Sequence, residues 1–462
     1  MSGAQARALL ADVDAWKARL GGRVHDRVAA AIYAEAQRIT GAAASRCGPV
    51  RNLTARFDAW LTSSWLGVPV MLALLALVFW ITIAGANLPS TLLARGLFWL
   101  EDQLVAGLDF VHSPWWLTGF LARGVYRGVS WVVSVMLPPM AIFFPLFTLL
   151  EDLGYLPRVA LNLDRFFRAA GAHGKQALTM SMGFGCNAAG VVACRIIDSP
   201  RERLVAILTN NFVPCNGRWP TLILLSTIFV ATGLPAALGA LASVGTLLGV
   251  TLLGVGVTLL VSAALTRTLL RGEASFFALE LPPYRRPQIL RVLYTSLIDR
   301  TAFVLWRAVL MAAPAGGVCW VLGNVNAGGR SLMAWVSGWL DPLGQAIGLN
   351  GVILLAYIVA IPANEIVVPT IAMAYLNAGH MVEVESLQQL SALLRGNGWT
   401  LLTAICLMLF SLLHYPCSTT TLTIWKETRS LKWTVLSNLL PLGVALLACF
   451  AVASAARLLG LA

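Results

Sequence analysis

The sequence predicts an all-α protein that crosses a membrane about seven to nine times. Of its 462 residues, 58% are hydrophobic and only 12% are charged, whereas a soluble domain carries about 25% charged residues. Its longest apolar runs reach the roughly 20 residues that a helix needs to cross a bilayer. Seven such runs lie near residues 66–88, 127–150, 203–232, 236–266, 302–324, 398–424 and 434–460.

Two further apolar segments, near 178–196 and 345–376, are shorter or interrupted. Basic loops flank the first segment on both sides, whereas Glu383 and Glu385 follow the second. Because Lys and Arg collect in cytoplasmic loops, we expect both ends of the first segment to be cytoplasmic and both ends of the second to be external. This predicts two re-entrant or broken segments that enter from opposite faces, as in an inverted repeat. A further membrane crossing within 324–350 would place the second segment on the other side of the membrane, and the opposite orientation of the two segments would be lost.

Charge and hydropathy predict four regions along the chain. Residues 1–62 are polar and basic and predict a cytoplasmic helical stalk, with a helix lying on the membrane surface as the alternative. Two transmembrane halves are expected at 63–270 and 302–462, joined by a cytoplasmic linker at 271–301. The formal charge of +12 is spread over short loops, which favours a multi-pass protein of the bacterial cytoplasmic membrane, with its N-terminus inside, over a nucleic-acid-binding protein.

Three cysteines lie where Gly and Pro interrupt apolar segments: Cys186 follows Gly185, Cys215 follows Pro214, and Cys417 follows Pro416. Irregular backbone at membrane depth is tolerated only where it is buried in protein or lines a wet cavity. Thiolate suits Fe(II) and Zn(II), whereas Mg(II) prefers oxygen. We therefore predict a metal-ion path with these cysteines as ligands; the alternative is that they pack between helices as small apolar residues.

That packing role is the one we expect of the other apolar cysteines, and we expect the thiols to be reduced. The cysteines expected to have this packing role are Cys194, Cys319, Cys406 and Cys449.

Oxygen ligands are available beside two of the thiols and in the second broken segment. Asn187 and Asn216 each adjoin a candidate cysteine and could add a carbonyl oxygen. Glu365 stands between two prolines in an apolar segment, where a carboxylate is costly. It is a candidate ion ligand or proton acceptor. The structural alternative is an ion pair with a buried arginine such as Arg218.

Three more side chains are candidates near the ends of the path. His414 precedes the third thiol motif and predicts either a further ligand or a hydrogen-bonded packing residue. Glu151 and Asp152 follow an apolar run, so they could load or release a cation, or pair with Arg158 at the membrane edge. The hydroxyls of 418–421 could line the path or bond back to their own helix.

Seven short motifs, taken in chain order, resemble the bacterial ferrous iron transporter B (FeoB) family over nearly everything after residue 60. They are LEDLGY at 150–155, GFGCN at 183–187, PCNGRWP at 214–220, ELPPYR at 280–285, NEIVV at 364–368, YPC at 415–417 and LKW at 431–433. The resemblance implies two gate-type halves, related to the wider nucleoside-recognition group, and ferrous iron transport.

The chain also departs from that family. FeoB proteins usually begin with a GTP-binding domain, but the sequence has no Gly-x-x-x-x-Gly-Lys-Ser/Thr motif, and GAHGKQ at 171–176 has the wrong spacing and is interpreted as a loop. We therefore expect no enzyme activity in the chain itself and a separately encoded GTPase as partner. Ala188, Pro214 and Asn364 replace residues common in the family, which leaves the identity of the ion open.

Three classes of function follow. The first is a permease for a divalent metal, Fe(II) before Mn(II) or Zn(II), in either direction, with the metal as cargo and no permanently bound cofactor. The second is a carrier for a nucleoside or similar solute, whose base could stack on Trp219, Tyr357 and Trp425. The third is a membrane scaffold or sensor paired with a GTPase. The oligomeric state, homo-oligomers included, stays open.

Overall fold

A computed structural model describes residues 15, 24–43, 58–63, 65–232, 235–271, 284, 287–382 and 386–460. In that part of the chain the only strands are β1 (Asn326–Ala327) and β2 (Arg330–Ser331), which form a small antiparallel hairpin. The described residues contain six helices that are long and apolar enough to span a membrane, or seven if one bent pair counts as a span. The prediction of an all-α polytopic protein is confirmed, at the lower end of the expected number of crossings.

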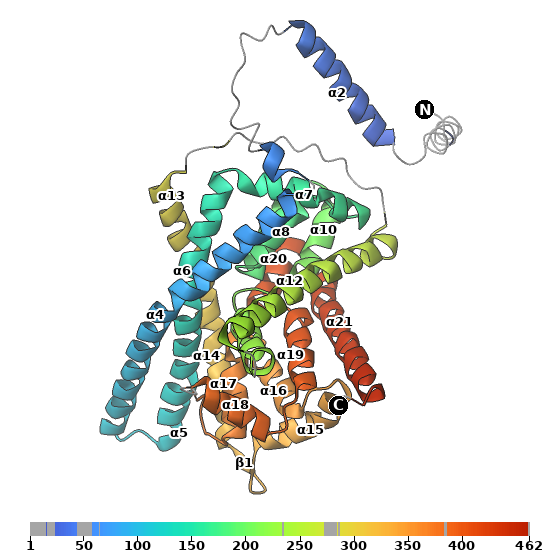
Figure 1. Cartoon of the computed structure of the whole chain (residues 1–462). Helices are drawn as coiled ribbons and strands as arrows, with labels where there is room; N and C mark the ends of the chain where they lie inside the picture. The colour runs from blue at the N-terminus through green and yellow to red at the C-terminus, as the bar shows by residue number, and fades with distance from the viewer. Residues whose placement is uncertain are drawn as a thin grey trace, which may run out of the picture.

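The first crossings form a long hairpin that extends to one side of the molecule (Figure 1). It consists of α4 (Gly67–Phe110) and the continuous helix made by α5 (Trp115–Thr118), the π-helix η1 (Gly119–Tyr126) and α6 (Arg127–Asp152). The first predicted run, 66–88, is thus only part of α4. Helix α4 has 44 residues. At about 1.5 Å per residue it is roughly 66 Å long, about twice the thickness of the hydrocarbon core of a bilayer.

Two halves with the same order of elements make up the rest of the membrane region. Helix α6, the end of the long hairpin, is also the start of the first half. The first runs from α6 through α7 (Tyr155–Ala169), a helical hairpin, a broken crossing and α12 (Ala236–Arg267). The helical hairpin of this half, called the first hairpin from here on, consists of α8 (Gln176–Gly183), α9 (Asn187–Ala193) and η2 (Cys194–Ile196). The broken crossing consists of α10 (Pro200–Thr209), η3 (Asn210–Phe212), α11 (Trp219–Leu225) and η4 (Ser226–Val230).

The second half begins after α13 (Ile289–Tyr294) and η5 (Thr295–Ala302). It contains α14 (Phe303–Asn324), α15 (Leu332–Ala346), and a hairpin made of α16 (Gly351–Val359), η6 (Asn364–Ile366) and α17 (Val367–Tyr375). Helix α18 (Leu387–Gly396) then leads into a broken crossing, α19 (Leu401–Leu413) and α20 (Ser418–Thr428), and into α21 (Leu431–Leu458).

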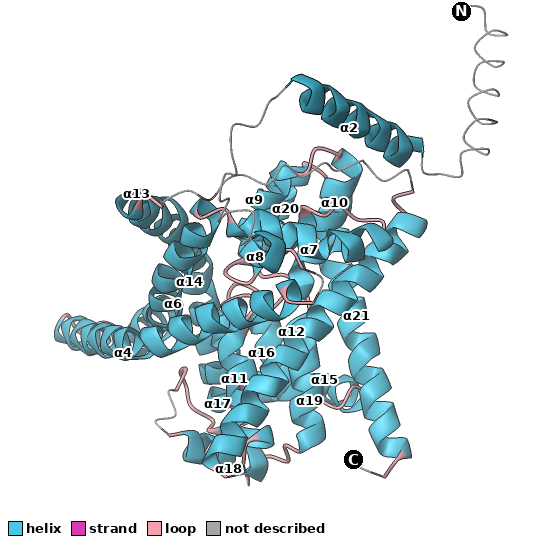
Figure 2. Cartoon of the chain, turned by 45° about the horizontal axis from the view of Figure 1, so that its top comes forward, coloured by secondary structure: helices cyan, strands magenta, loops and turns pink. Residues whose placement is uncertain are grey.

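The two halves have opposite directions. In Figures 1 and 2 the first hairpin and α7 lie at the end of the molecule next to α2 (Val24–Ala43), whereas α15, α17 and α18 lie at the other end. The segment 324–350, which could have held a crossing, contains β1, β2 and α15, and α15 meets α16 at 111°. Run 203–232 is divided into α10 and α11, so neither piece alone reaches the length of a span.

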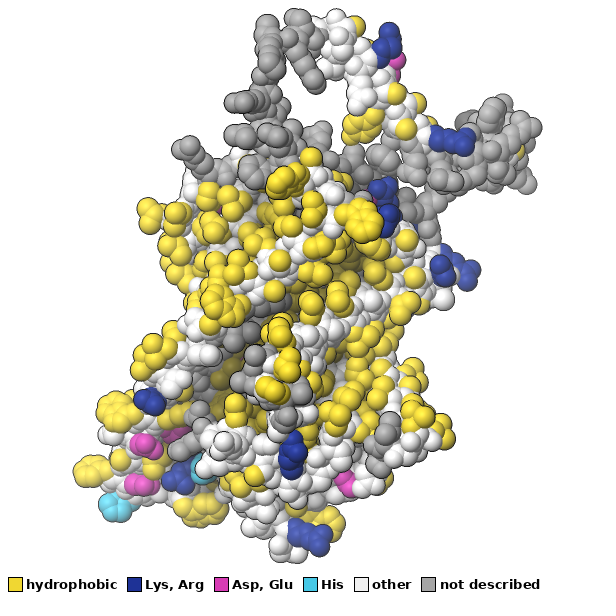
Figure 3. Space-filling model, in the orientation of Figure 1, with side chains coloured by type: hydrophobic (Ala, Val, Ile, Leu, Met, Phe, Trp, Pro, Cys, Tyr) yellow, Lys and Arg dark blue, Asp and Glu magenta, His cyan; other side chains and the backbone are white. Residues whose placement is uncertain are grey.

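The two halves meet through small residues. Gly124 and Gly128 face Gly316 of α14 so closely that a methyl group on Gly128 would lie 2.8 Å from the Gly316 Cα. Close approach through glycine is a common way for helices to associate in lipid, where hydrophobic burial gives no preference for protein contacts. Hydrophobic side chains cover much of the face shown in Figure 3, with Lys and Arg gathered toward its two ends.

The N-terminal region is anchored to the first half by a buried arginine. Arg158 of α7 donates from Nε to Asp58 Oδ1 at 3.0 Å, and Tyr284 of the linker donates to the same oxygen at 2.9 Å. The guanidinium carbon of Arg158 lies 4.1 Å from the centre of the Tyr284 ring. The suggested pairing of Arg158 with Glu151 or Asp152 is therefore wrong. The stalk prediction rests partly on residues 1–14, 16–23 and 44–57, which lie outside the described residues.

Candidate functional site

The tip of the first hairpin places Cys186 at the N-terminus of α9. Cys186 is extended, with φ −153° and ψ 122°, and it begins the helix that Asn187 continues. Gly185 is required just before it, because a methyl group there would overlap the Phe143 ring. The Asn187 side chain donates to Asn211 Oδ1 at 3.2 Å, which ties the hairpin tip to the neighbouring broken crossing.

The first broken crossing opens at Pro214 and Cys215. Proline has no N–H to continue the helical ladder, and the chain becomes extended at Val213, with φ −91° and ψ 137°. The Asn216 N–H donates to Gly185 O at 3.2 Å. The break is thereby held against the hairpin tip, with Cys215 beside Cys186.

Arg218 satisfies the backbone carbonyls that both breaks leave unpaired. Its guanidinium is 1% exposed and donates to Asn211 O at 2.7 Å and to Leu412 O at 2.8 Å. It also donates to His414 O at 3.1 Å. Arg218 thus binds carbonyl oxygens of the two broken crossings, and the suggested ion pair with Glu365 is wrong.

The second broken crossing opens at residues 414–417. Cys417 precedes α20 in an extended conformation, and its Sγ lies 3.3 Å from Thr420 Oγ1. The Ser418 N–H donates to Ile361 O at 2.9 Å, so this break is also held to the hairpin of its own half.

Glu365 lies in η6, within the second hairpin, and faces the first broken crossing. It is 9% exposed, and its carboxylate rests on Gly217, where a methyl group would overlap it. Its backbone carbonyl accepts from Trp131 Nε1 of α6 at 3.2 Å. The acid predicted from the sequence therefore reaches the first break from the opposite half.

These segments enclose one small cavity, of about 40 Å³. Of the predicted ligands, Cys186, Cys215, Cys417, Asn187 and Glu365 line it. The other lining residues include Met136, Gly217, Ala363, Asn364, Thr419 and Thr420. Four separate segments from both halves thus converge on one point, and sequence motifs almost 180 residues apart become neighbours.

His414 and Asn216 were also predicted as ligands, but neither lines this cavity. The His414 ring is fully buried, with Nδ1 2.9 Å from Ser411 O and Nε2 3.2 Å from Asn364 Oδ1. It also stacks on Phe410. His414 therefore has the packing role that was its alternative interpretation, because Nδ1 faces backbone carbonyls and Nε2 faces the Asn364 side chain.

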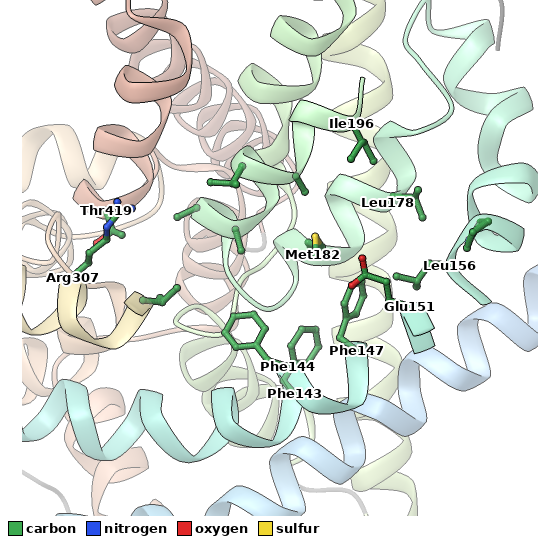
Figure 4. Close-up of a pocket in the computed structure, with 16 residues that line it drawn as sticks. Phe143, Phe144, Phe147, Glu151, Leu156, Leu178, Met182, Ile196, Arg307 and Thr419 are labelled. Carbon is green, nitrogen blue, oxygen red and sulfur yellow. The ribbon is translucent and has the colours of Figure 1, made fainter. Parts of the chain in front are cut away.

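A larger cavity of about 580 Å³ adjoins the small one, and Val304 and Thr419 line both. Figure 4 shows Phe143, Phe144 and Phe147 along one wall, and Arg307 with Thr419 on the opposite side. Glu151 and Asp152 are both exposed, but Glu151 lines this cavity and Asp152 lines neither cavity. The predicted acidic pair is thus divided, and only Glu151 faces a space that leads toward the cysteines.

In the described part of the chain, no three His, Cys, Asp or Glu side chains are close enough together to hold a metal ion at once. The cysteines share a cavity wall without forming a closed cage. A closed cage of four ligands is typical of structural zinc sites. The arrangement would suit an ion that binds these side chains one after another.

The remaining candidates behave as packing or loop residues. Cys194, Cys319, Cys406 and Cys449 are buried, and two of them donate to backbone carbonyls, Cys194 to Gly190 O and Cys449 to Cys406 O. The stretch 171–176 begins with a turn at Gly171, with φ +70°, as its interpretation as a loop requires. Burial lowers the pKa of His173 in this loop below its ordinary value.

Sequence reasoning missed the roles of Asn364, Gly217 and Ala363. The available signal was the repeated pair of a cavity residue followed by asparagine, Cys186–Asn187 in one half and Ala363–Asn364 in the other. The hydroxyl run at 418–421 lines the path in part, and the bonds of Ser418 and Thr421 go to residues outside their own helix, Ile361 and Asn438. Thr419 and Thr420 line the cavity, whereas Thr421 donates to Asn438 Oδ1.

The fold and the site define a multi-pass membrane protein made of two inverted gate-type halves that meet at broken helices. The family model for nucleoside recognition (Gate) matches residues 133–229 and again 305–431, once in each half. The model for the ferrous iron transport protein B C terminus matches 247–299.

The chain is 30% identical over 408 residues to the Fe(2+) transporter FeoB of Staphylococcus aureus (strain MSSA476), covering 86% of this chain and 58% of that protein. It is 30% identical over 356 residues to the Fe(2+) transporter FeoB of Legionella pneumophila (strain Paris), covering 72% and 45%. The chain thus spans about half the length of the curated relatives it matches. No solved structure matches. The chain belongs to the FeoB family and corresponds to its membrane part.

Proposed function

We propose that this protein carries a divalent metal, Fe(II) first, across the bacterial cytoplasmic membrane through the small cavity between its two halves. The observation that supports this most is the convergence of Cys186, Cys215 and Cys417 on that cavity, together with Glu365. Thiol and carboxylate ligands suit Fe(II), and sparse ligands allow the ion to leave again. The relatives' shared name, Fe(2+) transporter, points to the same cargo.

The basic loops support an orientation with α2 on the cytoplasmic side. The end of the molecule next to α2 carries Arg165, Arg168 and Lys175, and also Arg201 and Arg203 at the start of α10. The other end carries Arg330 on β2, Arg395 on α18 and Arg457 on α21, each more isolated. Since Lys and Arg accumulate in cytoplasmic loops, the larger cavity with Glu151 faces inward.

The energy source in this proposal is GTP hydrolysis, performed by a domain or protein outside these 462 residues. The described side chains of α2 are exposed, and the junction of Asp58, Arg158 and Tyr284 joins the N-terminal region to α7, which leads into the first hairpin. A partner pulling on the stalk would therefore act on the segment that ends at Cys186. Removing residues 1–44 should leave metal binding intact and abolish GTP-dependent uptake in cells.

A nucleoside carrier is the second candidate, favoured by the description of the Gate model. The three aromatic residues suggested for a base do not form a pocket. Tyr357 is buried against Phe410 and His414, Trp219 is buried in α11, and Trp425 is 45% exposed. The small cavity, at about 40 Å³, also lacks room for a base.

Uptake into sealed vesicles tests the proposal. The purified chain would be compared for Fe(II) under anaerobic reducing conditions, Mn(II), Zn(II) and a labelled nucleoside, with Cys186→Ser and Cys215→Ser alongside. Metal flux that collapses in either variant is the expected result. Nucleoside uptake without metal flux, unaffected by the cysteine changes, would reject metal transport.

A further inference from the structure

Ala363 stands in the second hairpin where Cys186 stands in the first. Each residue immediately precedes an asparagine and a helix, and each lines the small cavity. Their backbones match: φ −153° and ψ 122° at Cys186, φ −153° and ψ 116° at Ala363. The correspondence is therefore one of conformation as well as of chain order.

The surroundings of the two positions also correspond. In the first half, the Asn187 side chain bonds Asn211, four residues before Cys215. In the second half, Asn364 Oδ1 lies 3.2 Å from the ring of His414, three residues before Cys417. Each hairpin asparagine is thus joined to the end of its own half's helix, just before the break.

Main-chain bonds add a similar link in each half, although the accepting carbonyl lies one residue before Cys186 in the first half and two residues before Ala363 in the second. The residue after Cys215 donates its N–H to Gly185 O, and the residue after Cys417 donates to Ile361 O. Each cysteine of a broken crossing is thereby fixed beside the hairpin tip of the same half. The repeat generates four equivalent positions around the cavity: two at hairpin tips and two at breaks.

We propose that Ala363 is the fourth ligand position of this site, left without a thiol, and that its methyl group sets how tightly a soft divalent metal is held. This inference rests on the proposed function. Three of the four positions carry cysteine, and each thiol that binds the ion releases its proton. In the described residues no three His, Cys, Asp or Glu side chains are close enough together to hold an ion at once, so a thiol at 363 would add a ligand to a site that now has few, whereas transport needs a site that the ion can leave.

The test uses the full chain in vesicles and four variants: Ala363→Cys, Ala363→Ser, Cys186→Ala, and the double variant Cys186→Ala with Ala363→Cys. Zn(II) affinity would be measured by competition with a chelating dye, thiolate coordination by the ultraviolet absorbance of bound Cd(II), and transport by Zn(II) flux. Ala363→Ser is the matched control, since it adds an atom of similar position without a thiol.

We expect Ala363→Cys to bind Zn(II) at least about tenfold more tightly, a change of about 1.4 kcal/mol, and to transport it about tenfold more slowly. Its Cd(II) absorbance should rise by one thiolate, whereas Ala363→Ser, which adds an atom without a thiol, should show no such rise. The double variant should recover most of the flux lost in Cys186→Ala, because the thiol returns at the equivalent position. Recovery also shows that cysteine at 363 is compatible with the fold.

Two results would overturn the inference differently. If Cys186→Ala loses flux but Ala363→Cys behaves like Ala363→Ser and the double variant stays inactive, the equivalence of the two positions is wrong and the proposed function stands. If Cys186→Ala transports metal at the unmodified rate, the thiol path itself is wrong, and the role of Ala363 fails with it.

Discussion

The two broken crossings have the same backbone plan and different chemistry. Both open at a Pro-Cys pair and both are held to the hairpin of their own half. Three residues after Cys215, the first break has Arg218, whose guanidinium serves carbonyls of both breaks. Three residues after Cys417, the second break has Thr420, whose hydroxyl lines the cavity.

The difference teaches how a repeat can be made functional. The repeated backbone places two equivalent residues, one in each break. At one such pair of positions, Arg218 in the first break holds the fold together and Thr420 in the second break lines the path. Arg218 donates hydrogen bonds to carbonyls at membrane depth, and Glu365 places a carboxyl group at the cavity from the opposite half. Buried charge in a membrane is costly unless it serves a partner or a function, and here the two halves divide these roles.

Loss of a break cysteine should have the largest effect on metal flux. Cys417→Ser should lower metal flux roughly a hundredfold, about 2.7 kcal/mol at 1.36 kcal/mol per tenfold change, because it removes a soft ligand while keeping the size of the side chain. Cys406→Ser is the matched control, since Cys406 is buried in α19 away from the cavity. Equal flux loss in both variants would mean that cysteine replacement acts through folding.

Removing the Arg218 guanidinium should destabilise the fold. Arg218→Met leaves several buried carbonyl oxygens without donors, and each buried group left unsatisfied costs about 1–3 kcal/mol. We expect a total loss of at least about 3 kcal/mol, seen as a lower midpoint of thermal unfolding in detergent. Arg330→Met, at an exposed position, should leave the midpoint unchanged. If the two midpoints agree, the breaks do not depend on this clamp.

Gly217→Ala should act on transport by moving Glu365. The added methyl group would overlap the carboxylate, and displacing a functional group by about 1 Å can cost up to about a hundredfold in rate; we expect about a tenfold loss of flux. Gly256→Ala is the control, because nothing lies within 4 Å of the added atom. Glu365→Asp in the Gly217→Ala background should restore part of the flux, and no restoration would exclude the carboxylate as the cause.

The smallest effect is expected outside the membrane, at the junction of the stalk with α7. Burial alone would raise the pKa of Asp58, but hydrogen bonds from Arg158 and Tyr284 outweigh it and hold the pKa below the ordinary value. A depressed carboxyl pKa stabilises the junction above about pH 4 and the stabilisation disappears as the pH falls through the folded pKa. Asp58 is partly exposed, so Asp58→Asn should cost at most about 1 kcal/mol.

Hydrogen exchange of the α7 backbone would measure this. At neutral pH, Asp58→Asn should exchange faster than the unmodified chain, and the difference should disappear as the pH falls through the folded pKa of the wild-type carboxyl, which lies below its ordinary value. A difference that persists at acid pH would show that the carboxylate charge is not what holds the junction.

Hydropathy predicted the membrane class and most crossings, because a span is a local property of the chain. It missed that 203–232 is two helices, since the C-terminal part of α10 and the whole of α11 are apolar and only Pro214 and Gly217 mark the break between them. The thiol motifs pointed to the residues of the cavity for a similar reason. Each motif places a soft ligand next to a helix-breaking Gly or Pro, and this can be read from a short stretch of sequence.

The other site assignments depended on partners that a single sequence does not pair. Arg218 binds carbonyls of Leu412 and His414, 194 and 196 residues away, and backbone carbonyls have no sequence signature. His414 was a candidate ligand because imidazole suits the metal, but the turn at the end of α19 points its ring into hydrogen bonds with Ser411 and Asn364.

X-ray absorption by Zn(II) bound anaerobically to the purified full chain tests the central claim most directly. We expect sulfur neighbours at about 2.3 Å from the metal, and we expect them to disappear when Cys186, Cys215 and Cys417 are together replaced by serine. A bound ion surrounded only by oxygen and nitrogen in the unmodified chain, with the same spectrum in the triple variant, would contradict a thiol-lined path.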